Sequence, residues 1–302
     1  MKKVILAGGS GFLGKCIINH FKSNAQIIVL TRGEPRNNEN VQYVQWDGKT
    51  LGTWAELFEG SDVLINLNGK SVDCRYTESN KKLIYSTRLA STEVLGKAVQ
   101  KCKNPPKLWI NSSSATIYRH ALDRPMDEET GDIGTGFSVD VCQQWEKIFN
   151  SIQTVSTRKV AMRTAIVLGR DGGALKPLKN LAKLGVGGKQ GAGNQYFSWI
   201  HEQDFVSIID FIVEHDELNG AINVSNPNPV TNEHIMQALR KVVGIPFGLP
   251  MPGWLLELGA ILIGTETELV LKSRRVIPKR LHDAGYKFQF TKIENALADL
   301  CS

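Results

Sequence analysis

The sequence lacks the residue patterns that mark disulfide-rich, zinc-binding or membrane-spanning proteins. Its five cysteines among 302 residues are scattered and form no Cys-x-x-Cys pair, so we expect free thiols in a reducing compartment and no metal site. The apolar run near the start stops at Gly8, too short for a signal peptide. The stretch 254–264 carries Glu257 and falls short of the ~20 residues that a bilayer requires. We therefore expect a cytoplasmic protein without membrane contact.

The excess of basic over acidic residues is modest. The chain has 36 Lys and Arg against 30 Asp and Glu, a net charge of +6 and a pI near 9.0. The two signs are interspersed, and no RNA- or DNA-binding motif accompanies them. This balance fits an anionic small ligand, and we expect no nucleic-acid partner.

Short apolar runs alternate with helical patterns over the first half of the chain. Runs typical of strands buried on both faces occur at 4–7, 27–30, 41–44, 63–67, 108–111 and 160–168. Helical patterns lie at 15–23, 54–58 and 81–101, and later at 232–243 and 255–263. The alternation predicts an α/β fold with a doubly wound parallel sheet of the Rossmann type. We expect a Rossmann domain at 1–170 with a return segment near 200–225, and a smaller C-terminal α/β lobe at 171–199 and 226–302.

A glycine-rich turn follows the first predicted strand and opens the first helix. Gly8 would allow the tight turn, Gly11 the approach of a pyrophosphate, and Gly14 close packing of helix on strand. The helix N-terminus would then offer N–H groups to the phosphates. A bare glycine pattern also occurs in ordinary loops, but this placement favours a dinucleotide site. The expected contacts here are Gly8, Ser10, Gly11, Phe12, Leu13 and Gly14.

The end of the second predicted strand bears on which dinucleotide binds. Sites that prefer NAD place Asp or Glu there, whereas this chain has Arg32, which suits bidentate contact with a 2′-phosphate. The alternative is an exposed arginine, with the nearby Glu34 in the acidic role. We favour NADP(H) over NAD(H).

Further motifs, spread from residue 1 to about residue 300, point to one family. They include Asn66-Leu67-Asn68-Gly69, Tyr85-Ser86-Thr87-Arg88, Ser112-Ser113-Ser114-Ala115-Thr116-Ile117-Tyr118, Trp145-Glu146, Gly172-Gly173-Ala174-Leu175, Ser198-Trp199-Ile200-His201 and Val276-Ile277-Pro278. With these motifs the chain resembles an extended short-chain dehydrogenase/reductase. It is similar to the subfamily of NAD-dependent epimerase-like proteins with a C-terminal domain of unknown function.

The resemblance implies further cofactor contacts and a homodimer. The implied contacts are Leu67, Asn68 and Gly69 on the adenosine side, Ser112 and Ser113 beside the nicotinamide ribose, and Thr164, Ala165 and Ile166 flanking the nicotinamide. Ser112, Ser113 and the following Ser114 also come directly after a predicted buried strand. The carboxyl ends of parallel strands open onto a crevice where ligands bind. The dimer would form through two helices of the Rossmann domain.

The chain departs from the family in its proton-transfer residues. Relatives use a Ser or Thr with a Tyr-x-x-x-Lys pair, in which the lysine lowers the pKa of the tyrosine so that it can act as a general base. Ser114 stands at the serine position, but Ser138 and Cys142 replace the tyrosine and the lysine. Arg88 stands where relatives often have an asparagine of the proton relay.

Two residues remain as catalytic candidates, Ser114 and Tyr118. Tyr118 could instead belong to the core. Cys142 could be a redox thiol or, alternatively, an inert buried one.

Several residues are candidates for contact with a small-molecule substrate. Arg75 could pair with a carboxylate or phosphate or be solvated, and Trp199 and His201 could shape the substrate wall. His201 could also be purely structural. A basic cluster could receive the diphosphate of a nucleotide-linked ligand or form a solvated face; its members are Lys272, Arg274, Arg275, Lys279 and Arg280. An apolar segment is expected to bury against the lobe or a partner subunit; its members are Trp254, Leu255, Leu256 and Leu258.

The sequence thus predicts an NADP(H)-binding epimerase- or reductase-like protein that acts on a small hydroxylated or nucleotide-linked substrate. The alternative is a non-catalytic NADP(H)-responsive binding or regulatory protein. The missing tyrosine and lysine keep that alternative open, so the sequence alone does not decide whether the protein is an enzyme.

Overall fold

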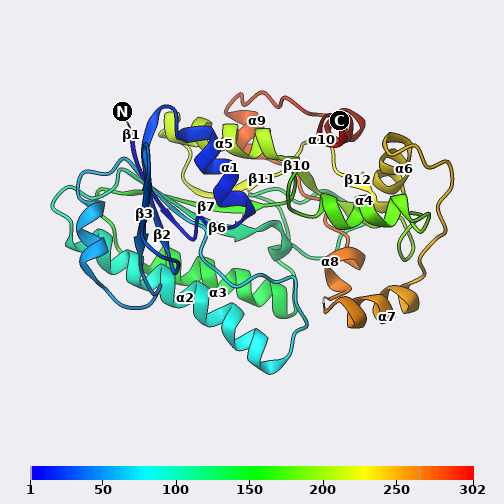
Figure 1. Cartoon of the computed structure of the whole chain (residues 1–302), viewed down its shortest axis with the longest axis horizontal. Coiled ribbons are helices and arrows are strands. Elements are labelled where there is room, and N and C mark those ends of the chain that lie inside the picture. The colour runs from blue at the N-terminus through cyan, green and yellow to red at the C-terminus, as the bar shows by residue number, and fades with distance from the viewer. Residues whose placement is uncertain (1, 265) are drawn as a thin grey trace.

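A large, mostly parallel β-sheet lies at the centre of the computed structural model, which describes residues 2–264 and 266–302 (Figure 1). Its strand order is β11-β7-β6-β5-β1-β2-β4-β3, and all pairs are parallel except β3 with β4. The strands are β1 (Lys2–Ala7), β2 (Ala25–Thr31), β3 (Arg36–Asn38), β4 (Val41–Gln45), β5 (Val63–Asn66), β6 (Leu108–Ser114), β7 (Arg158–Thr164) and β11 (Gly220–Val224). The predicted α/β fold of the Rossmann type is confirmed.

Strand β1 places the glycine turn at the centre of the sheet. Ala7, near its end, lies opposite Leu30 of β2 and Asn66 of β5, so the three strands end at the same edge. Strands β2 to β4 lie on one side of β1 and the later strands of this sheet, from β5 on, lie on its other side; ligands of such sheets bind where the strand order reverses. The topology therefore brings the segments after β1, β2 and β5 together.

Helices cover both faces of the sheet (Figure 1). Helices α1 (Phe12–Phe21) and α5 (Glu202–Glu214) lie on one face, with α2 (Glu78–Lys101) and α3 (Phe137–Ser151) on the other. Successive side chains of a strand point to opposite faces of the sheet. In β1, Val4 and Leu6 therefore belong to the core on one face, and Ile5 and Ala7 belong to the core on the other. The predicted return segment contains α5 and β11, and β11 pairs with β7.

The strand predicted at 160–168 is divided in two. The N–H of Ala165 still donates to the carbonyl of Val224 beside the large sheet, but that of Ile166 donates to the carbonyl of Ser198. The chain then continues as β8 (Ile166–Leu168), which pairs with β10 (Trp199–His201). The residues of this run carry no local signal for this change of partner strand. The short antiparallel β3 was not predicted either.

A second lobe holds its own core around Trp199 and Leu297. Its elements are α4 (Leu175–Lys183), β9 (Tyr196–Phe197), β12 (Val230–Thr231), α6 (Asn232–Val242), α7 (Gly253–Ile263), α8 (Glu268–Leu271) and α10 (Ile293–Cys301). Helix α9 (Lys279–Asp283) instead packs beside β11, and its Leu281 belongs to the core of the large sheet. Trp254 and Leu258 are 68% and 52% exposed, so our expectation that they bury against the lobe was wrong for these two side chains. Their contact with a partner subunit stays a prediction, as does the domain division at residue 170.

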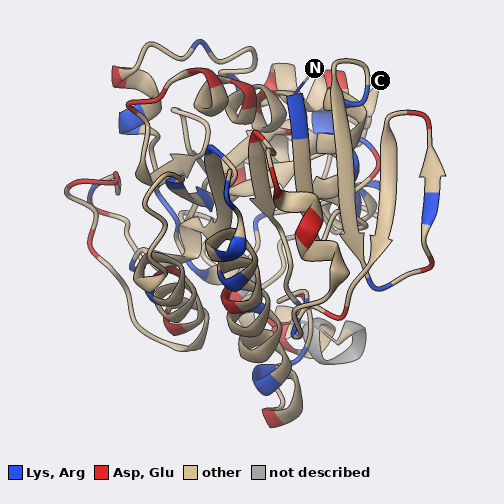
Figure 2. Cartoon of the chain, turned by 90° about the vertical axis from the view of Figure 1, so that its left-hand side faces the viewer, with Lys and Arg blue, Asp and Glu red and all other residues tan. Residues whose placement is uncertain are grey.

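Charges of both signs are interspersed over the molecule. Figure 2 shows Lys and Arg alternating with Asp and Glu along the helices that face the viewer. Within residues 2–264 and 266–302, no helix is long and apolar enough to cross a membrane.

Candidate functional site

Backbone atoms leave no room for larger side chains at two positions of the glycine turn between β1 and α1. Gly8 has a φ of +77°, and a Cβ there would lie 2.8 Å from the backbone of Asn68. A Cβ on Gly14 would lie 2.3 Å from the carbonyl oxygen of Gly9. A Cβ on Gly11 would meet nothing within 4 Å. The turn is therefore packed tightly against the fold but open on the side where a ligand would approach.

Helix α1 begins without a side-chain cap. Its N-cap residue is Gly11, and the first hydrogen bond of the helix runs from the N–H of Lys15 to the carbonyl of Gly11. Ser10 is exposed, and Phe12 and Leu13 are half-buried. The N–H groups of the first turn can thus hold a phosphate, and this end of α1 fits the pyrophosphate of a dinucleotide.

Replacement of Gly14 by alanine should test this packing. The added methyl group would collide with the backbone at Gly9, so we expect about 1–3 kcal/mol of destabilisation, together with loss of dinucleotide binding. Thermal unfolding and a cofactor titration measure the two effects. Gly259→Ala is the matched control, because Gly259 also lies in a helix and its Cβ would meet nothing within 4 Å. Equal behaviour of the two variants would contradict the assignment.

Arg32 is exposed just after β2 and lines a pocket of about 540 Å³. The other lining residues are Trp46, Asp47, Gly48, Lys49, Asn68, Gly69, Lys70, Ser71, Leu83, Ser86 and Thr87. The pocket therefore unites Arg32 with Asn68 and Gly69, which the resemblance assigned to the adenosine side. The third residue of that group, Leu67, packs against the core on one face of the sheet.

The carboxylate of Asp47 in this pocket is already occupied by its own loop. Its Oδ1 accepts from the N–H groups of Lys49 and Thr50, each at 2.8 Å, and its Oδ2 accepts from the hydroxyl of Thr50 at 2.6 Å. The Thr50 hydroxyl and these N–H groups lower the pKa of Asp47 to about 2. Glu34 is not among the residues that line this pocket in the described chain. The pocket has an excess of positive charge, as a 2′-phosphate requires.

The ends of β6 and β7 carry the residues expected beside the nicotinamide. Ser112 lies opposite Met162, and Ser114 lies opposite Thr164. The hydroxyl of Ser113 donates to Glu146 Oε1 at 2.6 Å, whereas the Ser114 hydroxyl accepts from the N–H of Thr116 at 3.2 Å. Ser114 and Thr164 thus lie side by side, followed by Ala165 and Ile166 where β8 begins.

An ion pair holds these strand ends against α3. Arg163 donates from Nε to Glu146 Oε1 at 2.8 Å and from Nη2 to Oε2 at 2.7 Å. The two side chains are 11% and 12% exposed. Because Ser113 also bonds Glu146, the pair links β6, β7 and α3.

Helix α3 shows what replaces the missing tyrosine and lysine. The hydroxyl of Ser138 donates to Glu268 Oε2 at 2.9 Å and lies 3.1 Å from that of Tyr76. Cys142 is buried, and burial raises the pKa of its thiol to about 12. The thiol is therefore protonated at neutral pH, which disfavours a redox or nucleophilic role.

The protonated state of Cys142 predicts low reactivity. We expect iodoacetamide at pH 8 to label Cys74 on its surface loop while sparing Cys142, because alkylation needs the thiolate and access to it. Mass spectrometry of tryptic peptides measures both sites, and unfolding in urea should make Cys142 react. Labelling of Cys142 as fast as Cys74 in the folded protein would contradict the inert assignment.

Arg88 lies on α2 and contacts the loop after β5 and helix α3. Its Nη1 donates to the carbonyls of Lys70 at 2.8 Å and Ile84 at 3.1 Å, and its guanidinium lies 5.0 Å from the centre of the Trp145 ring. The position that holds a relay asparagine in relatives thus holds a cation here.

Tyr118, one of the two catalytic candidates, lies in the core. It is 1% exposed; its hydroxyl donates to Asn223 Oδ1 and accepts from Arg163, both at 2.9 Å. Burial raises its pKa. These surroundings are those of a structural tyrosine, and its acid–base role stays untested.

The three residues predicted to contact substrate are engaged within the chain. Trp199 is buried and donates from Nε1 to the carbonyl of Asn228 at 3.1 Å. His201 is buried, and its Nδ1 caps α5 by accepting from the N–H of Gln203 at 3.0 Å. Arg75 forms ion pairs with Glu257 at 3.6 Å and Glu266 at 3.4 Å. Each side chain thus has partners within the chain, and its contact with a substrate stays a prediction.

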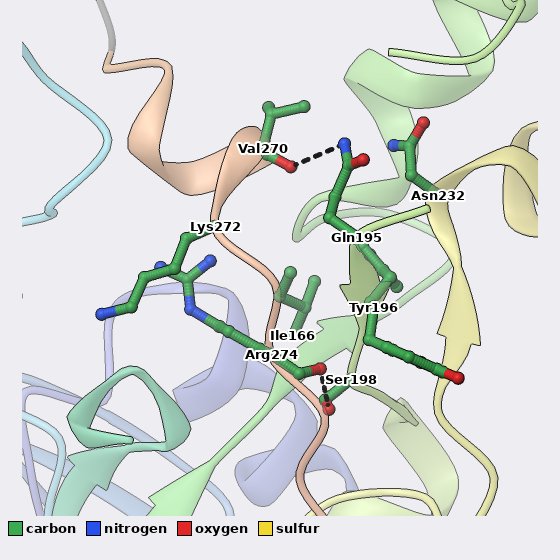
Figure 3. A pocket seen from close by; sticks show the side chains of 9 residues that line it. Ile166, Gln195, Tyr196, Ser198, Asn232, Val270, Lys272 and Arg274 are labelled. Atoms are coloured by element: carbon green, nitrogen blue, oxygen red, sulfur yellow. Dashed lines mark hydrogen bonds between the residues drawn. The ribbon is translucent and has the colours of Figure 1, made fainter. Parts of the chain in front are cut away.

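The structure contains a second pocket that the sequence did not predict (Figure 3). Its walls are Ile166, Gln195, Tyr196, Phe197, Ser198, Asn232, Val270, Lys272 and Arg274. The predicted basic cluster is divided, because Lys272 and Arg274 face this pocket while Arg275 lies over the ring of Tyr196 at 4.5 Å. The roles of Tyr76 and Glu268 were also missed, since no local pattern marks them.

Comparisons with known proteins agree with this geometry. Residues 4–138 match the NAD dependent epimerase/dehydratase family, and residues 251–300 match a domain of unknown function (DUF1731). The epimerase family protein YfhF of Bacillus subtilis is 32% identical over 98% of this chain and 97% of its own. The epimerase family protein SERP0438 of Staphylococcus epidermidis is 30% identical over 99% of both chains.

A solved structure resembles the whole chain. The crystal structure of human epimerase family protein SDR39U1 with NADPH has a TM-score of 0.86 and 26% identity, and covers 99% of both chains. The chain therefore belongs to the NAD-dependent epimerase/dehydratase family, among the epimerase family proteins that end in this domain of unknown function.

Proposed function

We propose that this protein binds NADP(H) in preference to NAD(H) and acts as an epimerase- or reductase-like enzyme on a small hydroxylated or nucleotide-linked substrate. The observation that carries the proposal is the pocket after β2. Arg32 and Lys70 line it, and its carboxylate, Asp47, is committed to its own loop. The likeness to the human relative, whose structure contains NADPH, supports it.

Each half of the cofactor has residues that fit it. The first turn of α1 would hold the pyrophosphate, and Arg32 the 2′-phosphate. Ser112 to Ser114 and Thr164 to Ile166 would hold the nicotinamide half, fixed in place by the pair Glu146 and Arg163. When bound, the cofactor supplies hydride chemistry at this end, and the chain orients substrate and cofactor for it.

Calorimetric titration of the purified protein with NADPH and with NADH, after removal of any copurified nucleotide, tests the proposal. We expect NADPH to bind at least about tenfold more tightly, as one charge-assisted contact provides. Equal affinities would refute the preference. Binding of neither would refute a functional dinucleotide site.

A non-catalytic NADP(H)-responsive protein is the second candidate, favoured by Ser138 and Cys142 at the positions of the tyrosine and the lysine. Oxidation of NADPH followed by absorbance with a panel of carbonyl compounds separates the two. An enzyme turns over at least one class of compound, whereas a sensor binds the cofactor and turns over none.

A further inference from the structure

Two basic side chains meet at the boundary between the lobes. Lys272 and Arg274 lie on the segment between α8 and α9, and Figure 3 shows both side chains projecting to the same side of it with their charged ends close together. Both line the pocket next to Ile166.

Both side chains are anchored on Thr116. Lys272 Nζ donates to the Thr116 carbonyl at 3.2 Å, and Arg274 Nε donates to its hydroxyl at 3.1 Å. Thr116 lies in the short 3-10 helix η2 (Ala115–Ile117), directly after Ser114 at the end of β6. The two cations therefore lie at the end of the site that is expected to hold the nicotinamide.

The charge here is buried and predominantly positive. The Lys272 side chain is 10% exposed and Arg274 is 6% exposed. Burial lowers the pKa of both groups, and for Lys272 the charge of Arg274 adds to the effect. Electrostatic interactions also link Cys142 to both of them and to Arg88.

Glu268 offsets only part of this charge. Its Oε1 lies 3.7 Å from Lys272 Nζ, and its other oxygen accepts from Ser138. Burying charge in excess of its counter-charge costs free energy, which a bound anion would recover.

The same pocket contains a buried acceptor that lacks a donor. Gln195 is 5% exposed, and its Nε2 donates to the carbonyl of Gln190 at 2.7 Å. Its Oε1 is buried and accepts no hydrogen bond from any residue that the structure describes. Buried polar atoms are nearly always satisfied, so this oxygen calls for a ligand hydroxyl, a ligand N–H group or a water. The enclosed space is about 10 Å³, room for roughly one water-sized group.

We propose that Lys272 and Arg274 bind an anionic group of the substrate, a carboxylate or a phosphoryl group, while a water fills the space beside Gln195. The substrate class is then a small anionic hydroxy or carbonyl compound. This inference rests on the proposed function, because it places the substrate beside the nicotinamide end of the proposed cofactor site. The cofactor's own phosphates would lie elsewhere, at the turn after β1 and at Arg32.

Anion binding to the NADPH-saturated protein tests the inference. Inorganic phosphate and, separately, acetate are titrated at constant ionic strength, with calorimetry and the thermal midpoint as readouts. Lys272→Gln and Arg274→Gln should each weaken binding of the preferred anion at least about tenfold, as loss of a charge-assisted hydrogen bond does. Whether phosphate or acetate binds more tightly identifies the group.

The control is Arg275→Gln, which removes the same charge one residue along the chain. Arg275 lies over Tyr196 and donates to the carbonyl of Asp123 at 3.1 Å, so this variant should bind the anion as the wild type does. Lys272→Arg keeps the charge and should also retain anion binding. The thermal midpoint of each variant without anion shows whether a loss of binding in Lys272→Gln reflects a loss of folding.

Three results would overturn the inference: no saturable anion binding by the wild type, equal losses in all three glutamine variants, or competition between phosphate and NADPH. The NADPH affinity of each variant is measured in parallel and should not change. If the wild type fails to bind NADPH, the proposed function fails, and the same anion titration on the cofactor-free protein still decides the role of the two cations.

Discussion

Replacement of Arg32 by alanine should weaken NADPH binding by about tenfold to a hundredfold and leave NADH binding nearly unchanged. The reason is that Arg32 is the basic residue at the end of β2 in a pocket whose carboxylate, Asp47, is already bonded to its own loop. Loss of a charge-assisted contact to a phosphate accounts for an effect of this size. Titration of both cofactors into the variant measures it.

Arg36→Ala is the control for Arg32. Arg36 lies four residues further on, in β3, with its guanidinium 4.3 Å from the centre of the Tyr43 ring, and it does not line the pocket in the described chain. It carries the same charge, so it corrects for a general change in electrostatic attraction. Equal losses of NADPH and NADH affinity in Arg32→Ala would rule out the contact with the 2′-phosphate.

Replacement of Glu146 by alanine should lower the free energy of unfolding by about 3–5 kcal/mol. The variant would leave the guanidinium of Arg163, 11% exposed, without its bidentate partner, and would remove the acceptor of the Ser113 hydroxyl. An unpaired buried charge is among the most destabilising changes that a single substitution makes. Equilibrium unfolding in urea, followed by tryptophan fluorescence and circular dichroism, gives the value.

The control for Glu146 is an exposed ion pair. Glu93 and Lys97 are 2.8 Å apart on the surface of α2 and are 55% and 58% exposed, so Glu93→Ala should change stability by less than about 0.5 kcal/mol. The double variant Glu146→Met, Arg163→Met should lose less stability than Glu146→Ala, since it leaves no buried charge. If Glu146→Ala is no less stable than Glu93→Ala, the ion pair does not hold the strand ends as we infer.

Local patterns in the sequence were sufficient for the architecture of the first half. Continuous apolar runs such as 4–7 and 27–30 are typical of strands covered on both faces, as in a parallel sheet between helices. The glycine spacing at 8, 11 and 14 likewise reflects a steric need, and the backbone atoms near Gly8 and Gly14 show it. Burial and backbone dihedral angles are local properties, so residue type and period encode them.

The tertiary structure alone decided which side chains meet. Lys272 and Thr116 are 156 residues apart in the chain, and Ser138 and Glu268 are 130 apart, so no period or motif relates them. The same holds for the break between β7 and β8, where Ile166 leaves one sheet for a partner strand that lies far along the chain. His201 caps α5 and Trp199 lies in the core of the second lobe, and no local pattern marks either contact. Such contacts depend on how the lobes pack, because each side chain responds to every element around it, and only the folded chain brings those elements together.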